Sequence, residues 1–262
     1  MAFDFDGKRY KEASKHQKEW GNKIIQEMNI KEDSFILDLG CGDGVLTQIL
    51  SNKVPRGKVI GIDASKGMID TAIEIREENL EFRFMDINDI NFEEKFDLIF
   101  SNAALHWVKN HKELFYKCNN VLKDGGRIRF NFAGHGNCQN FFEVVKDIAK
   151  YEEYNTYFKD FEWPWYMPSI NEYKELANEA KVFKNINIYE ENADRYFQNE
   201  EQIIGWIDQP SIVPFISILP ENIKQEFRNK VVEKMLERTK QEDGTYFETF
   251  RRINILAEKV WK

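Results

Sequence analysis

The sequence predicts an α/β fold around a doubly wound, mostly parallel β-sheet, and three patterns within residues 30–135 support it. Short apolar runs alternate with segments whose apolar residues recur at helical spacing. The runs are apolar at nearly every position, as in strands buried on both faces of a parallel sheet. A glycine-rich turn separates the first run from the next helix. Such a sheet carries helices on both faces, and ligands bind beyond the carboxyl ends of its strands.

The elements follow in chain order. In the first half we expect strands at 35–39, 59–62, 80–85, 96–100 and 128–132, and helices at 10–28, 45–50, 68–78 and 111–122. Ser65 is a plausible N-cap, and Asp124-Gly125-Gly126 stops the last of these helices. In the second half we expect helices at 141–154, 170–180, 203–207 and 221–240, strands at 186–197 and 246–260, and an aromatic loop at 157–168.

The chain shows no internal repeat and no low-complexity linker. One domain over residues 1–262 is therefore more economical than two. We expect its core sheet at about 30–135, with helical insertions that form a cap at about 136–182 and 198–243.

The charge pattern disfavours a nucleic-acid partner. The formal net charge is −8, whereas a duplex binder needs a basic footprint to displace counterions. Arg127 and Arg129 lie two residues apart in a predicted strand. We interpret this pair as one solvated strand face, with an anion contact as the alternative.

Membrane, export and metal signals are weak. No apolar run reaches the roughly 18 residues of a spanning helix, and the acidic start does not resemble a secretory signal. Cys41, Cys118 and Cys138 are widely spaced and form no C-x-x-C pair, which argues against a disulfide framework or a metal site. We expect a cytoplasmic protein without a membrane partner; the oligomeric state stays open.

The most informative motif is Asp38-Leu39-Gly40-Cys41-Gly42-Asp43-Gly44, directly after the first strand. Glycines allow a tight turn and close backbone approach to a ligand, and the helix that follows directs its positive end to the same place. A purely structural turn is one alternative. A dinucleotide fingerprint is another, but Val45 stands where its third glycine belongs, and no P-loop lysine follows.

Polar residues also follow the other strands. Asp63 ends the second strand, where a carboxylate can accept two hydrogen bonds from a ribose diol. Asp86 and the N–H of Ile87 follow the third strand and could read an adenine edge. Asn102 follows the fourth and could hold an amino group. Each carboxylate taken alone could instead be an acid at a helix terminus or in a loop. The occurrence of these polar residues in order, each at the end of a strand, is more specific.

These motifs resemble the series found in class I S-adenosylmethionine-dependent methyltransferases. The resemblance rests on 38–44, Asp63, Asp86, 96–108 and 122–126, and the stretch Asn-Ala-Ala-Leu-His-Trp at 102–107 is similar to the trans-aconitate and juvenile hormone acid methyltransferase group. It implies a Rossmann-like sheet of seven strands whose last strand runs antiparallel. It also implies S-adenosylmethionine as cofactor. Asp124 departs from the proline of many relatives but lies in a turn.

The resemblance implies a set of cofactor-binding residues. Residues 38 to 42 line the methionine and ribose parts, the second strand's end binds ribose, and the third strand's end reads adenine. The residues carried over are Tyr10, Asp38, Gly40, Cys41, Gly42, Asp63, Ala64, Met68, Asp86, Ile87, Asn102 and Ala103.

Candidates for the acceptor side are fewer. His106 follows the fourth strand near the expected methyl group and is the catalytic candidate, with a packing role as the alternative. Trp107, Trp163, Tyr166 and Trp206 are candidate substrate contacts, although each is equally at home in a core. Trp163 and Tyr166 could belong to an aromatic lid.

The expected function is methyl transfer to a small molecule, with a carboxylate oxygen as the first choice of acceptor. A carrier-bound acyl group, an amine or a phenol remain alternatives. A non-catalytic nucleoside-binding protein and an NAD-dependent oxidoreductase are the competing classes; glycine spacing and the absence of a Tyr-x-x-x-Lys motif argue against the oxidoreductase.

Overall fold

The computed structural model describes residues 15–260 and divides into two compact units. Unit 1 comprises residues up to 135, 165–191 and those from 252 on; unit 2 comprises 136–164 and 192–251. Residues 165–182, which we expected among the cap segments, belong to unit 1. The single-domain organisation stays a prediction.

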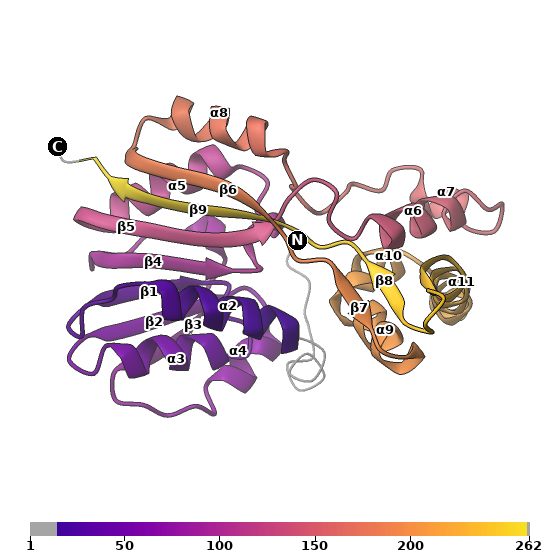
Figure 1. Ribbon diagram of the computed structural model, residues 1–262, viewed down its shortest axis with the longest axis horizontal. Helices are drawn as coiled ribbons and strands as arrows, with labels where there is room; N and C mark the ends of the chain where they lie inside the picture. Colours follow the sequence, from indigo (N-terminus) through magenta and orange to yellow (C-terminus); the bar gives the residue numbers. More distant parts are fainter. Residues whose placement is uncertain (1–14, 261–262) are drawn as a thin grey trace. The chain divides into compact units, whose positions relative to one another are not determined.

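Unit 1 contains a seven-stranded sheet in the order β3-β2-β1-β4-β5-β9-β6 (Figure 1). Strands β1 to β5 pair in parallel, and β9 runs antiparallel to β5. This confirms the seven-stranded, Rossmann-like fold with one antiparallel strand. The strands are β1 (Phe35–Leu39), β2 (Lys58–Asp63), β3 (Leu80–Phe84), β4 (Phe96–Asn102), β5 (Leu122–Ala133), β6 (Phe183–Asn192) and β9 (Arg251–Lys259).

Helices cover both faces of this sheet because successive side chains of each strand point to opposite sides. Ile36 faces a cluster with Ile25 of α2, whereas Leu37 faces a cluster with Phe115 of α5 and Tyr173 of α8. The helices of unit 1 are α2 (Lys15–Glu27), α3 (Val45–Lys53), α4 (Lys66–Ala72), α5 (His111–Val121) and α8 (Ile170–Ala180), with 3₁₀ turns at Ile87–Asp89 and Leu105–Trp107.

Several local predictions are confirmed and others need correction. Ser65 caps α4, and its side chain accepts a hydrogen bond from Met68 N. That helix ends at Ala72 instead of 78, and β5 begins at Leu122, so the glycines expected to separate helix from strand lie inside the strand. Arg127 is exposed, as a solvated face requires, but Arg129 is buried, so that interpretation is wrong for Arg129.

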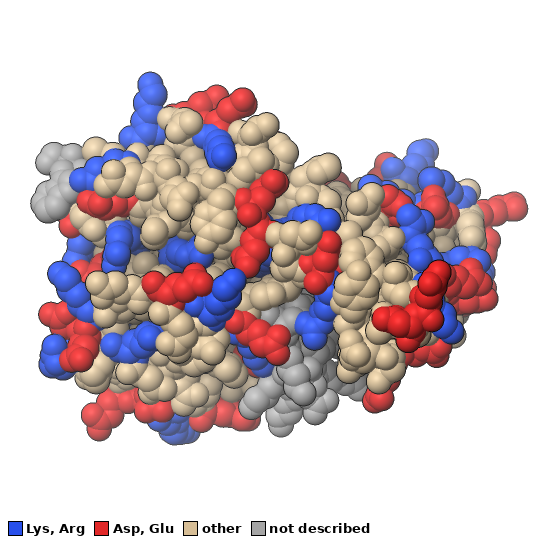
Figure 2. Space-filling model, viewed as in Figure 1, with Lys and Arg blue, Asp and Glu red and all other residues tan. Residues whose placement is uncertain are grey.

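Charges of both signs are interspersed over the face shown in Figure 2. Within residues 15–260, no helix combines the length and apolar character needed to cross a bilayer.

Unit 2 is mainly helical and has an aromatic core. Its helices are α6 (Gln139–Ile148), α7 (Asn155–Phe158), α9 (Glu200–Trp206), a π-helix (Ile207–Ser211), α10 (Val213–Ser217) and α11 (Glu221–Thr239), and β7 (Arg195–Phe197) pairs with β8 (Tyr246–Glu248). Phe215 of α10 and Phe227 of α11 are almost fully buried. Each of the two strands expected in the second half is therefore two strands, β6 with β7 and β8 with β9.

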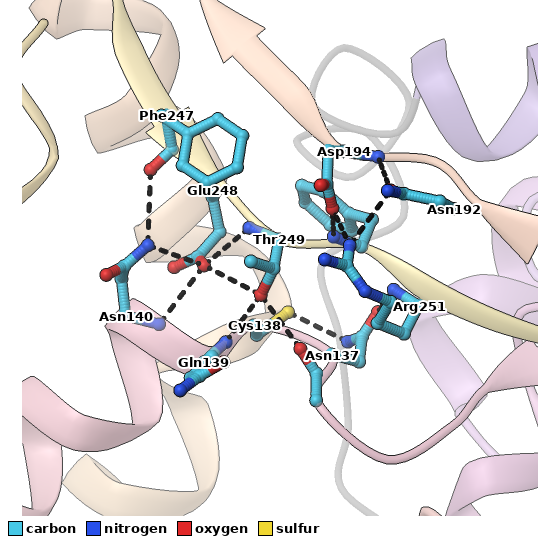
Figure 3. A network of polar contacts seen from close by, with 12 residues as sticks. Asn137, Cys138, Gln139, Asn140, Asn192, Asp194, Phe247, Glu248, Thr249 and Arg251 are labelled. Carbon is cyan, nitrogen blue, oxygen red and sulfur yellow. Dashed lines mark hydrogen bonds and ion pairs between the residues drawn. The ribbon is translucent and has the colours of Figure 1, made fainter.

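Polar side chains lie where those strands break (Figure 3). Asp194 Oδ1 accepts a hydrogen bond from Phe250 N at 2.9 Å and pairs with Arg251. Glu248 is fully buried and accepts hydrogen bonds from the N–H groups of Phe141, at 2.8 Å, and of Thr249, at 2.7 Å. These side chains thus accept from the N–H groups of Thr249 and Phe250, the two residues between β8 and β9.

Candidate functional site

The glycine-rich turn after β1 forms the floor of the site. Gly40, Gly42 and Gly44 have φ values of 71°, 55° and 81°, a region that favours glycine. A Cβ atom on Gly40 would lie 2.2 Å from the Cβ of Ala104. The N–H groups of Gly40 and Cys41 both donate to Ile62 O, at 2.8 and 2.9 Å, which anchors the turn to β2.

Two carboxylates flank this turn. Asp38 is buried, and Thr47 Oγ1 donates to its Oδ2 at 2.7 Å. Burial raises the pKa of Asp38 to about 7, although the Thr47 hydrogen bond opposes the shift. Asp63 accepts hydrogen bonds from Gly42 N at 2.9 Å and Ser65 N at 2.8 Å. Burial raises the pKa of Asp63 as well. The N–H of Ala64 also donates to Asp63, and the two carboxylate oxygens keep some accepting capacity.

The ends of β2 and β3 lie side by side, because Asp63 pairs with Phe84 in the sheet. Asp86 Oδ1 accepts from Asn88 N at 2.7 Å and so caps a 3₁₀ turn. The negative charge of Asp86 also raises the pKa of Asp63, so the two carboxylates are close enough to interact. Met68 and Ile87 are both buried.

A pocket at this edge of the sheet brings several expected residues together. The space within it is about 400 Å³ when the open solvent at its mouth is counted. Its lining contains six of the expected residues, Asp38, Gly40, Cys41, Gly42, Asn102 and Ala103. Asp63, Ala64, Met68, Asp86 and Ile87 do not line it, and Tyr10 lies outside the described residues.

The wall of this pocket includes an ion pair that the sequence did not reveal. Lys18 Nζ of α2 lies 2.7 Å from Asp43 Oδ2, and only 5% of the Asp43 side chain is exposed. Asp43 stands in the glycine motif, but its partner comes from a distant helix. No local signal distinguishes Lys18 from the other charges of α2.

The end of β4 has an unusual backbone. Ala103 has a φ of 58°, which a non-glycine residue adopts only at a cost. Its N–H donates to Asn131 O of β5 at 2.7 Å, which holds the turn in place. This conformation directs the chain from buried Asn102 into the 3₁₀ turn that carries His106.

His106 is half-buried, and its Nδ1 atom is fully buried without a hydrogen-bond partner among residues 15–260. Burial and the positive charge of Arg252 lower the pKa of His106 to about 3. The ring is therefore neutral at pH 7. The backbone carbonyl oxygen of His106 accepts a hydrogen bond from Tyr166 N at 2.8 Å, which fixes the 3₁₀ turn.

Arg252 of β9 is a buried charged residue that the sequence did not reveal. It is 4% exposed, and its Nε and Nη2 atoms donate to Asn131 Oδ1 at 2.8 and 2.5 Å. Its guanidinium carbon lies 5.0 Å from the centroid of the Trp20 ring. Asn131 therefore holds a buried cation whose charge lowers the pKa of His106. Arg252 pairs with Ala133, the last residue of β5, and so lies at the carboxyl end of that strand.

The aromatic candidates fall into both units. In unit 1, the Trp107 ring lies 5.1 Å from that of Trp165, and the Tyr166 ring lies 4.9 Å from that of His111. In unit 2, Trp206 is buried and packs on Phe141 at 5.6 Å. Trp163 packs on Phe142 at 5.0 Å.

The family comparison agrees with this geometry. A methyltransferase-domain family matches residues 30–202. A trans-aconitate 2-methyltransferase of Mycolicibacterium gilvum is 28% identical over 89% of this chain and 91% of its own length. A malonyl-[acyl-carrier protein] O-methyltransferase of Ilyobacter polytropus is 28% identical over 78% of this chain and 72% of its own length.

A solved structure shares the fold. Phosphoethanolamine N-methyltransferase 2 of Haemonchus contortus, in complex with S-adenosyl-L-methionine, is 18% identical with a TM-score of 0.61. The similarity covers 97% of this chain and 57% of that one. The chain belongs to the methyltransferase-domain family and is a class I S-adenosylmethionine-dependent methyltransferase. Within that class it resembles the trans-aconitate methyltransferase group.

Proposed function

We propose that this protein transfers the methyl group of S-adenosylmethionine to a carboxylate oxygen of a small organic acid. The observation that carries the acceptor class is Arg252, a buried guanidinium held by Asn131 beside His106. Guanidinium groups form strong, directional hydrogen bonds with carboxylates.

The donor occupies the pocket at the glycine turn in this proposal. Asp38, Gly40, Cys41 and Gly42 surround its methionine and ribose parts. The ribose and adenine parts extend over the ends of β2 and β3, toward Asp63, Ala64, Met68, Asp86 and Ile87, and Asn102 and Ala103 hold the amino group. The place of Asn102 and Ala103 in the pocket lining and the spare accepting capacity of Asp63 support this orientation.

The chemistry requires positioning more than proton transfer. The carboxylate oxygen attacks the methyl carbon in line with the carbon–sulfur bond, which breaks as the new carbon–oxygen bond forms. The electron pair goes to sulfur, and the products are a methyl ester and S-adenosylhomocysteine. Alignment at near-contact distance supplies much of the acceleration.

The state of His106 supports an acceptor that is already ionised. A general base works best when its pKa is near the operating pH, whereas the pKa of His106 is lowered to about 3. His106 is therefore a poor proton acceptor for a hydroxyl or an amine. The role of His106 toward the acceptor remains a prediction.

The relatives add support to this class. Aconitate and the carrier-bound malonyl group, after which these relatives are named, both carry free carboxylates. Trp107 and Tyr166 are proposed walls of the acceptor site, and Trp163 and Trp206 remain predicted contacts. A cytoplasmic location also remains a prediction.

The test is transfer of a labelled methyl group to panels of small carboxylic acids, acyl-carrier thioesters, amines and phenols. The proposal expects a base-labile methyl ester from a free acid. A product only on the carrier-bound panel would favour the carrier alternative, and a base-stable product would contradict the carboxylate. Calorimetry with S-adenosylhomocysteine and NAD separates a methyltransferase from an oxidoreductase, and donor binding without any transfer would favour a non-catalytic protein.

A further inference from the structure

A second pocket of unit 1 lies between helix α2 and strand β6 and shares no lining residue with the donor pocket. It encloses about 540 Å³, including its mouth. The lining residues that matter are Trp20, Lys23, Glu27, Arg129, Tyr189 and Glu191. They come from α2, β5 and β6, so the site exists only in the folded sheet.

A buried cation lies at the base of this pocket. Arg129 is 6% exposed, and burial lowers its pKa. Its Nη1 and Nη2 atoms both donate to Asn254 Oδ1 at 3.0 Å, and Nη2 donates to the Tyr189 hydroxyl at 3.3 Å. Among residues 15–260, no carboxylate lies within ion-pair distance of this guanidinium. A buried charge with only neutral partners favours an added anion.

The mouth of the pocket has the opposite character. Glu27 is exposed there, and Glu191 lies 3.2 Å from Lys23 Nζ in a solvated pair. Both glutamates raise the pKa of Arg129 through their charge without contacting it. They would repel a simple anion, and more strongly a dianion, on its way to Arg129. A ligand with charges of both signs satisfies both ends of the pocket.

We propose that this pocket binds a small zwitterion whose carboxylate contacts Arg129 and Tyr189 and whose ammonium group contacts Glu27 and Glu191. The Tyr189 hydroxyl makes a long hydrogen bond to Arg129, and the side chain is 40% exposed. It is therefore free to rotate and donate to a ligand carboxylate. Trp20 and Ile24 provide an apolar wall for the short carbon chain between the charges.

The first experiment is an NMR titration of the protein saturated with S-adenosylhomocysteine, so that the donor pocket is occupied. The probes are glycine, β-alanine and 4-aminobutyrate, with acetate and methylammonium as single-charge controls. At least one zwitterion should shift the amide signals of residues 20–27 and 189–191, and should bind roughly tenfold more tightly than either control, the value of one charge-assisted contact. Acetate binding of equal strength, or shifts confined to residues 40–43, would overturn the proposal.

Variants locate the two halves of the ligand. Tyr189→Phe and Glu27→Gln should each weaken zwitterion binding roughly two- to tenfold, because each removes one polar contact. Glu19→Gln changes another exposed acid of α2, outside the pocket, and should leave binding unchanged. Unchanged affinity in both Tyr189→Phe and Glu27→Gln would disprove the site.

Discussion

The proposed donor and acceptor sides of this sheet edge are built in different ways. The donor side is largely one continuous segment, residues 38–44, whose backbone geometry and carboxylates form the pocket floor. The acceptor side combines His106, Asn131 and Arg252, which are far apart in the sequence. Short-range backbone geometry suits a ligand that never changes, whereas separate side chains can be exchanged without disturbing the turn. The difference suggests how one fold keeps its cofactor while its acceptors vary.

The largest expected effect comes from the backbone of the donor side. Gly40→Ala places a Cβ 2.2 Å from Ala104 Cβ at a φ of 71°. Strain and overpacking together should cost about 2–6 kcal/mol of stability, measured by chemical denaturation. Gly205→Ala is the matched control, since a Cβ there meets nothing within 4 Å, and it should be neutral or slightly stabilising. Equal stability of the two variants would contradict the account.

The two sides should also respond oppositely to pH. The pKa of Asp38 is raised from 3.8 to about 7, so its contribution to stability is present below pH 4 and is lost as pH rises toward 7. The pKa of His106 is lowered from 6.5 to about 3, so its contribution is present above pH 6.5 and is lost as pH falls.

As pH rises from about 4 to 7, the stability of Asp38→Asn relative to wild type should increase by up to about 4 kcal/mol. As pH falls over the same range, the stability of His106→Gln relative to wild type should increase. Denaturant unfolding of the ligand-free protein across this range measures both slopes. If the stabilities of both variants relative to wild type changed with pH in the same sense, the opposite pKa shifts of Asp38 and His106 would be contradicted.

A smaller effect should distinguish the proposed acceptor site from the proposed donor site. Arg252→Lys keeps the positive charge but cannot donate through two nitrogen atoms, as Arg252 does to Asn131. It would also lose the paired hydrogen bonds proposed with the acceptor carboxylate. We expect kcat/KM for the acid to fall roughly 10- to 100-fold, equivalent to about 1.5–3 kcal/mol, with unchanged affinity for S-adenosylhomocysteine. Arg127→Lys changes an exposed arginine of the same sheet and should alter neither quantity. A parallel loss of donor affinity would mean that Arg252 supports the whole edge.

The same contrast explains what could be predicted from sequence. The parallel strands and the glycine turn follow from local signals, namely apolar runs, helical spacing and the residues that adopt positive φ. Arg252 could not be found in this way, because its role depends on Ala133 of β5 pairing with it, across more than a hundred residues of chain. The contacts of Asp194 and Glu248 at the strand breaks were equally hidden, since both residues act through partners on other segments.

Calorimetric titration of S-adenosylhomocysteine into the wild type and into Asp63→Ala tests the donor assignment most directly. The account predicts one site per chain and a loss of about 1.5–3 kcal/mol in the variant, the value of hydrogen bonds to a charged group, with its folding monitored in parallel. Wild-type affinity in Asp63→Ala, or no binding by the wild-type protein, would contradict it.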